Sequence, residues 1–183
     1  MKKVYIYMAE GFEEIEALAP ADLLRRAGAQ VTLVSITDSL TVCGARGVSV
    51  VCDSTVSDSL SLPDMILLPG GYPGYKNLAE SKQVEDIIKL MLDQNRFVAA
   101  ICASPAAVLG AKGLLKNSSA VCYPGMEDSL NCKKIVSDGV CSDGNIITAK
   151  SAAFAIDFSL TLIERLFDAQ TRRKVADQIV YNG

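Results

Sequence analysis

Short apolar runs alternate with segments of helical periodicity along the chain. The stretches KKVYIYM (2–8) and GAQVTLVSI (28–36) are rich in β-branched and aromatic residues, and a run of helix formers separates them. This order predicts a strand, a helix that Gly28 closes as a C-cap, and a second strand. Pro20 lies inside the helical run, and because proline has no amide hydrogen we expect a kink or a restart there.

The middle of the chain repeats this order. DMILLPGG (64–71) and RFVAAIC (96–102) are short and apolar, as buried parallel strands are. A helix is expected over about 84–93. A second helix should begin directly after residue 102, with Ser104 as its N-cap and Pro105 at its first position.

The remaining patterns complete a mixed α/β fold. LTVCGARGVSVVCD (40–53) predicts a small hairpin, and KIVSDGVCSDGNIITAK (134–150) predicts two strands around a turn. An apolar stripe over 152–167 and an amphipathic segment over about 170–181 predict two final helices. We expect one domain over 1–183, with a mainly parallel sheet covered by helices on both faces.

Charge and hydropathy exclude several classes of function. Lys and Arg number 18 against 21 Asp and Glu, and no basic run follows a phosphate backbone, so we expect no nucleic-acid partner. The N-terminal apolar run is interrupted by Glu10 and Gly11, which favours a first strand over a signal peptide. No apolar run approaches the ~18 residues of a membrane span, so we expect no membrane association.

The cysteine and histidine counts limit the chemistry. Six cysteines without a CxxC pair or an export signal predict free thiols in a reducing cytoplasm. Histidine is absent, which removes the commonest metal ligand and the usual partner of a catalytic thiol, so we expect no metal and no cofactor. Cys52 and Cys141 lie in apolar segments and are expected to be buried, whereas the pattern decides nothing for Cys43, Cys122 and Cys132.

Cys102 stands where the segment FVAAIC ends and the next helix is expected to begin. Reactive groups in open α/β sheets gather at the carboxyl ends of strands, and a tight strand-to-helix turn holds its central residue in a strained conformation. The small residues Ala103 and Ser104 suit such a turn. Amides of the following helix should lower the pKa of the thiol. The alternative is that Cys102 is one more buried thiol.

Two other segments belong to the same edge of the sheet. EGFEEIE follows the first strand; Glu13 and Glu14 are expected to be surface charges at a helix start, whereas Glu16 is the one expected to point inward. A carboxyl group buried beside the thiol would have a raised pKa and could donate a proton. In LPGGYPG, beside Gly70, the amide of Gly71 could pair with that of Ala103 as an oxyanion pocket. Taken alone, the two glycines indicate only a tight turn, and the segment does not match a nucleotide-binding loop.

Taken together, EGFEEIE, RRAG, LPGGYPG with NLAES, and AAICASPAAVL resemble the ThiJ/PfpI family, in the branch that holds the parkinsonism-associated human protein and its bacterial relatives. The resemblance covers nearly the whole chain. It implies a flavodoxin-like three-layer α/β sandwich, a homodimer, an oxidation-prone cysteine at Cys102 and a protonated glutamate at Glu16. It also implies amide donors at Gly71 and Ala103, and it likens Arg46 to an arginine near the family's dimer interface and active site.

The chain departs from the family at three places. Protease-like members carry His directly after the cysteine, where this chain has Ala103, so a Cys-His protease is excluded. Some relatives have His-Pro beside the cysteine where this chain has Tyr123 and Pro124, and a tyrosine is a poor base because its reference pKa is ~10. KSAAFA (150–155) replaces a glycine-rich turn.

Two functions follow from the resemblance. The first is a cofactor-independent glyoxalase or deglycase, in which Cys102 attacks a small carbonyl substrate and Glu16 moves a proton. The second is a redox-sensing stress protein or chaperone whose Cys102 is oxidised to a sulfinate held by Glu16. A role in thiamine synthesis rests on the family's historical name, and no residue supports it.

Overall fold

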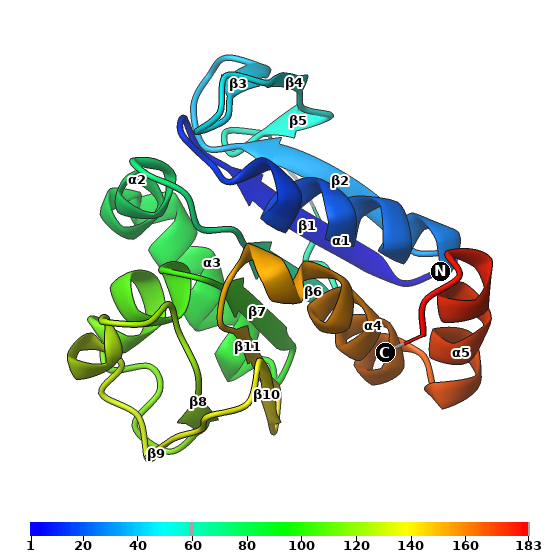
Figure 1. The fold of residues 1–183 in the computed structure, drawn as a ribbon. Helices are drawn as coiled ribbons and strands as arrows, with labels where there is room; N and C mark the ends of the chain where they lie inside the picture. Colours follow the sequence, from blue (N-terminus) through cyan, green and yellow to red (C-terminus); the bar gives the residue numbers. More distant parts are fainter. Residues whose placement is uncertain (59–60, 183) are drawn as a thin grey trace.

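A seven-stranded sheet forms the centre of the computed structural model, which describes residues 1–58 and 61–182 (Figure 1). The strand order is β10-β11-β7-β6-β1-β2-β5. All pairs are parallel except β10 with β11. The strands are β1 (Lys3–Met8), β2 (Gln30–Ser35), β5 (Ser54–Thr55), β6 (Met65–Leu68), β7 (Phe97–Ile101), β10 (Val140–Asp143) and β11 (Ile146–Ala149).

Helices cover both faces of this sheet, as predicted. Side chains of a strand point alternately to opposite faces, so each central strand contributes to two cores. Ile6, Leu67 and Ala99 pack in the core that includes helices α1 (Glu14–Arg26) and α4 (Ala155–Leu166), together with α5 (Ala169–Gln178). Tyr7, Ile66 and Val98 pack in the other core, with α3 (Lys82–Asp93), the π-helical turn η1 (Pro105–Gly110) and α2 (Gly74–Glu80).

The predicted hairpin is confirmed as β3 (Thr41–Cys43) paired antiparallel with β4 (Ser49–Val51). Two backbone bonds fasten it to the loop after β1: Gly11 N donates to Cys43 O at 2.8 Å, and Ala45 N donates to Phe12 O at 2.7 Å. The hairpin loop is thereby held at the carboxyl edge of the sheet. A second, parallel pair was not predicted and joins β8 (Ser119–Ala120) to β9 (Lys134–Ile135).

Several boundaries differ from the sequence predictions. Helix α1 runs through Pro20 without a restart and ends at Arg26. Its C-cap residue is Ala27, and Gly28, which was expected to be the cap, follows with a φ of +89°. The short helix α2 was not predicted. The helix expected from residue 152 is preceded by a 3₁₀ turn, η3 (Ala152–Phe154), and α4 itself starts at Ala155. Another 3₁₀ turn, η2 (Glu127–Ser129), follows β8.

Ser104 and Pro105 occupy the N-cap and first positions of η1, as predicted, but the Ser104 side chain does not cap the helix. The backbone of Ser104 is already helical, and its Oγ donates to the carbonyl oxygen of Pro69 at 2.5 Å instead of accepting from a helix amide. The hydroxyl therefore ties the turn after β7 to the loop after β6. These are the two loops on which the sequence placed Cys102 and Gly71.

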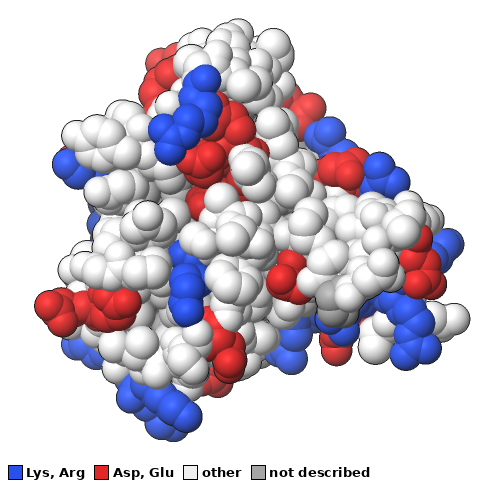
Figure 2. All heavy atoms as spheres, viewed as in Figure 1, with Lys and Arg blue, Asp and Glu red and all other residues white. Residues whose placement is uncertain are grey.

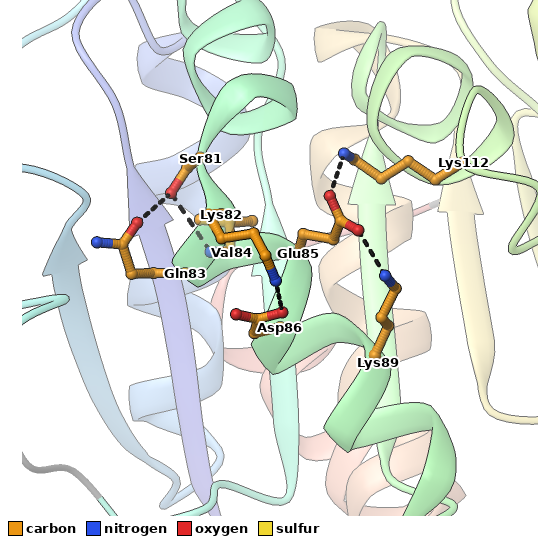
Figure 3. A network of polar contacts seen from close by, with 8 residues as sticks. All are labelled: Ser81, Lys82, Gln83, Val84, Glu85, Asp86, Lys89 and Lys112. Carbon is orange, nitrogen blue, oxygen red and sulfur yellow. Dashed lines mark hydrogen bonds and ion pairs between the residues drawn. The ribbon is translucent and has the colours of Figure 1, made fainter.

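A network of charged side chains holds α3 on the outer surface (Figure 3). Ser81 Oγ accepts from the amide of Val84 at 3.3 Å and caps the helix. Glu85 accepts a hydrogen bond from Lys112 at 2.7 Å and another from Lys89 at 2.5 Å. These two bonds lower the pKa of Glu85 to about 2, and the bond from Lys112 has the larger effect. Lys112 follows η1 in sequence, so Glu85 links α3 to the segment beyond the Cys102 turn.

Within the described residues, each helix is too short or too polar to cross a membrane.

Figure 2 shows acidic side chains gathered beside a basic one at the end of the molecule where the hairpin lies, whereas Lys and Arg are scattered over the rest of the visible face.

Candidate active site

Cys102 occupies a strained turn directly after β7. Its φ is +67°, in the left-handed region that residues with a Cβ rarely adopt. The backbone is held on both sides, because Cys102 N donates to Ala149 O at 2.9 Å and Cys102 O accepts from Tyr123 N at 2.7 Å. This over-determined geometry confirms the predicted strained turn, a feature that clusters at functional sites. The side chain is half-buried, so the thiol is neither sealed in the core nor fully exposed.

Backbone amides converge on the sulfur. The amides of Ala103 and Gly71 face Cys102 and lower the pKa of its thiol. Gly71 reaches this position with φ of +87°, and a Cβ there would lie 2.3 Å from Glu13 N. Only glycine satisfies both conditions. The two amides that the sequence paired as an oxyanion pocket therefore lie together, around the thiol.

Glu16 points inward from the first turn of α1, as expected. Its side chain is 1% exposed, and its Oε2 accepts from Gly70 N at 2.8 Å. The Cys102 side chain lies beside it, because a Cβ at Gly70 would lie 2.7 Å from Glu16 Oε2 and 3.1 Å from Cys102 Sγ. Burial raises the pKa of Glu16 to about 7, against the opposing effects of Gly70 N and of Cys102. Glu16 can therefore hold a proton beside the sulfur near neutral pH.

The prediction that the pKa of Cys102 is lowered is wrong. Burial raises it to about 12, and the negative charge of Glu16 adds to the rise, outweighing the amides of Ala103 and Gly71. The helix expected to stabilise the thiolate is only the six-residue turn η1. Because two adjacent buried groups resist double ionisation, the pair holds at most one negative charge near neutral pH. A thiolate forms there when Glu16 keeps the proton.

Gly70 makes this contact between acid and thiol possible. A Cβ at Gly70 would lie 2.7 Å from Glu16 Oε2 and 2.8 Å from Cys102 Cβ, closer than real side-chain atoms approach. The sequence placed Gly70 in the pocket without a defined part. In the structure, the missing side chain of Gly70 leaves the room that Glu16 and Cys102 share beside the loop after β6.

Glu14 is not the surface charge that its helix-start position suggested. It is 8% exposed, and its Oε1 accepts from Arg46 N at 2.8 Å and from Val48 N at 3.3 Å. Its Oε2 is buried without a hydrogen-bond partner among the described residues. Glu14 therefore clamps the hairpin loop against α1. Glu13 is not a surface charge either, because its side chain is 16% exposed. No local sequence signal showed the burial of these two residues, because it depends on where the hairpin folds back.

Glu13 and Arg46 face each other at the rim. Glu13 Oε2 lies 3.8 Å from the Arg46 guanidinium, and the Arg46 side chain is 75% exposed whereas that of Glu13 is 16% exposed. Arg46 lines the same cavity as Cys102, and its ionic partner there is Glu13.

A cavity of about 410 Å³ opens above the thiol. Its described lining consists of Glu13, Arg46, Gly71, Tyr72, Tyr75, Cys102, Ala103, Tyr123, Pro124 and Met126. Tyr123, expected in the pocket, lies on its wall and is 49% exposed. Tyr72 and Tyr75 were not predicted, although both stand in or next to the LPGGYPG segment, where two aromatic residues in a loop were the available signal.

The other cysteines lie outside this cavity's described lining. Cys52 and Cys141 are buried, as predicted, Cys122 is buried too, and Cys43 and Cys132 are half-buried.

Among the described residues, no group of three or more His, Cys, Asp or Glu side chains is arranged to hold a metal ion.

Comparison with known proteins agrees with the geometry. Residues 2–165 match the model of the DJ-1/PfpI family. The chain is 38% identical over 181 residues to Arabidopsis thaliana "Protein DJ-1 homolog B", which covers 98% of this chain and 41% of that protein. It is 31% identical over 160 residues to Caenorhabditis elegans "Glutathione-independent glyoxalase DJR-1.2", covering 86% of this chain and 84% of that protein.

The fold agrees as closely. The solved structure "Toxoplasma gondii DJ-1, oxidized" superposes with a TM-score of 0.95 at 37% identity and covers 100% of both chains. The chain spans less than half the length of the Arabidopsis relative, so only the shared domain is compared there. The match over residues 2–165, with a nucleophile turn and a buried glutamate in the expected places, shows that the chain belongs to the DJ-1/PfpI family.

Proposed function

We propose that this protein is a cofactor-independent, glutathione-independent enzyme that converts reactive dicarbonyls or their adducts to hydroxy acids. The observation that carries the proposal is that Cys102 and Glu16 lie side by side in a site open to a cavity, since a Cβ at Gly70 would lie 2.7 Å from Glu16 Oε2 and 3.1 Å from Cys102 Sγ. A nucleophile and a proton-carrying group in contact are the minimum that this chemistry needs. The Caenorhabditis elegans relative named a glutathione-independent glyoxalase supports the same reaction class.

The first step is addition of sulfur to the aldehyde. The Cys102 thiolate forms a C–S bond with the aldehyde carbon of a 2-oxoaldehyde, and the carbonyl oxygen takes the proton of Glu16, giving a hemithioacetal. Because the pair carries one negative charge in total, this proton transfer leaves the charge on Glu16. The amides of Gly71 and Ala103 stabilise the thiolate that attacks.

The second step is an internal redox exchange. Glu16, now a carboxylate, removes the hydrogen of the former aldehyde carbon as a proton and returns it to the neighbouring ketone carbon through an enediol. The aldehyde carbon is oxidised to a thioester while the ketone is reduced to an alcohol, so no external oxidant or reductant is needed. Water then breaks the C–S bond, which releases the 2-hydroxy acid and regenerates the thiol.

A redox-sensing role uses the same two side chains. Peroxide would convert Cys102 to a sulfinate, and a protonated Glu16 would donate a short hydrogen bond to it. The contact between Glu16 and the half-buried sulfur supports this second candidate as well. Mass spectrometry after mild peroxide should place the added oxygens on Cys102, and even oxidation of all six cysteines would contradict it.

The expected assembly is a homodimer. Two exposed apolar side chains, Ile15 and Val48, support it. Both lie next to Glu14, because Ile15 follows it in sequence and the amide of Val48 donates a hydrogen bond to its carboxylate. They therefore offer neighbouring apolar surface for a second copy of the chain. Sedimentation at micromolar concentration tests this proposal. A cytoplasmic location is proposed from the six free cysteines.

Turnover of methylglyoxal without glutathione tests the enzyme proposal. Wild-type protein should release lactate, and Cys102→Ser should lower the rate by about a thousandfold or more, as loss of a nucleophile does. Cys132→Ser is the matched control, because Cys132 is a half-buried cysteine outside the described cavity lining. Equal rates in wild type and Cys102→Ser would reject the proposal.

A further inference from the structure

Three tyrosines surround the thiol, from two separate parts of the chain. Tyr72 and Tyr75 lie on the loop after β6 and at the start of α2, and Tyr123 follows β8. The rings of Tyr72 and Tyr75 lie 6.3 Å apart between centroids with an interplanar angle of 55°, an ordinary aromatic pair. Together with Pro124 and Met126 they make most of the cavity wall aromatic or apolar.

Folding does not account for these rings. Tyr72 is 66% exposed and Tyr123 is 49% exposed, so neither fills the core. The Lys76 ammonium lies 4.8 Å from the centroid of the Tyr72 ring, which holds this exposed ring in place from one side. Held aromatic side chains that open onto a reactive thiol constitute a recognition surface.

The charges in the cavity balance. Among the described lining residues Glu13 and Arg46 are the ionised side chains, and they face each other at 3.8 Å. The described lining thus carries no net charge that would attract a carboxylate or phosphate on the substrate. The site therefore suits an uncharged substrate.

The volume exceeds what a three-carbon dicarbonyl needs. A cavity of about 410 Å³ has room for about a dozen water molecules, at ~30 Å³ each. Methylglyoxal would leave most of that water against tyrosine and methionine side chains. A planar ring in its place removes apolar surface from water on both partners.

We propose that the preferred substrates are arylglyoxals, 2-oxoaldehydes whose ketone carbon bears an aromatic ring. This inference rests on the proposed function, since the dicarbonyl end reacts at Cys102 and Glu16 as above. The ring lies against Tyr72, Tyr75 and Tyr123. One water is consumed, and an aryl-substituted 2-hydroxy acid leaves.

The first test compares kcat/KM for phenylglyoxal and methylglyoxal. The ratio should favour phenylglyoxal by about tenfold, the factor that one or two aromatic contacts supply. Tyr72→Ala and Tyr75→Ala should each lower this ratio about threefold or more. Tyr72→Phe should preserve the ratio, because it keeps the ring. Tyr181→Phe is the control, because Tyr181 lies outside the described lining of the cavity. A ratio near one, or one that the tyrosine variants leave unmoved, overturns the inference while the proposed function stands.

The second test does not depend on turnover. Cys102 is alkylated with 2-bromoacetophenone or with bromoacetone, each rate is divided by that of free cysteine, and the modified residue is located by peptide mass spectrometry. The normalised rate should be about tenfold higher for the aryl reagent and should fall in Tyr72→Ala and Tyr75→Ala. If this preference appears but neither dicarbonyl is turned over, the aryl site stands and the proposed function fails. Equal normalised rates overturn the aryl site.

Discussion

Glu16 and Glu85 show one chemical group at equivalent helix positions with opposite behaviour. Each lies in the first turn of its helix, α1 or α3. Burial raises the pKa of Glu16 to about 7, whereas the hydrogen bonds from Lys112 and Lys89 lower that of Glu85 to about 2. Helix position contributes in the same direction to both, so it does not set the difference.

The difference lies in what the rest of the fold brings to each carboxyl group. Glu85 meets two ammonium groups at the surface and serves as an anion that links α3 to the segment after η1. Glu16 meets a thiol and the amide of Gly70 inside the protein. Only a carboxyl group that is short of compensating charge can keep a proton at neutral pH and deliver it to a substrate.

The largest expected effect concerns stability against pH. Because the folded-state pKa of Glu16 is raised from 4.5 to about 7, folding favours its protonated form. This contribution is complete below pH 4.5 and is lost as pH rises through 7. The free energy of unfolding should therefore fall by about 3 kcal/mol across that window through this group. Denaturant unfolding at pH 4.5 and 8 measures it.

Glu16→Gln is the comparison for that measurement. The variant should lose this part of the pH dependence, because glutamine does not titrate. Its glyoxalase rate should also drop by about 10²- to 10⁴-fold, the usual worth of a general acid–base group. A variant whose unfolding free energy falls with pH as steeply as in wild type would show that Glu16 is not the group responsible.

The next effect tests the spacing between acid and thiol. In Gly70→Ala the new methyl group meets Glu16 Oε2 at 2.7 Å and Cys102 Cβ at 2.8 Å, so the two side chains must separate. Misplacement by about 1 Å costs about a hundredfold in rate, so kcat should fall by that factor while the protein still folds. Gly28→Ala, where a Cβ meets nothing within 4 Å but the φ of +89° is strained, is the control: it should cost stability and leave kcat unchanged. Full activity in Gly70→Ala would mean that the contact is dispensable.

The smallest effect is at the surface. Because the pKa of Glu85 is lowered from 4.5 to about 2, its ion pairs stabilise the fold at neutral pH, and this contribution disappears as pH falls from 4.5 toward 2. Glu85→Gln should lower Tm slightly at pH 7, leave Tm unchanged near pH 2, and leave turnover unchanged at pH 7. Exposed ion pairs are weak, so calorimetry at low ionic strength is the suitable measurement. A loss of turnover would show that the α3 link reaches the active site.

The sequence by itself predicted the layers of the fold and the residues of the candidate site. Alternating apolar runs and helical periods sufficed for the longer strands of the sheet, the hairpin and the longer helices, because these patterns report which side of each element is buried. They did not predict the short elements α2, β5, β8 and β9. Cys102 was recognisable because it ends an apolar run before small residues, and Glu16 because it lies among apolar residues in a segment that follows a strand.

Tertiary structure alone decided the properties that depend on distant contacts. The direction of the Cys102 pKa shift depends on burial and on Glu16, which lies 86 positions earlier in the chain. Ser104 bonds the loop after β6 instead of capping a helix, and Glu14 turns from an apparent surface charge into a clamp on the hairpin. Local patterns describe the preference of each segment for water or core. They contain no information about which charge or donor a fold will place against a given atom, and at short range in a low dielectric that neighbour decides its chemistry.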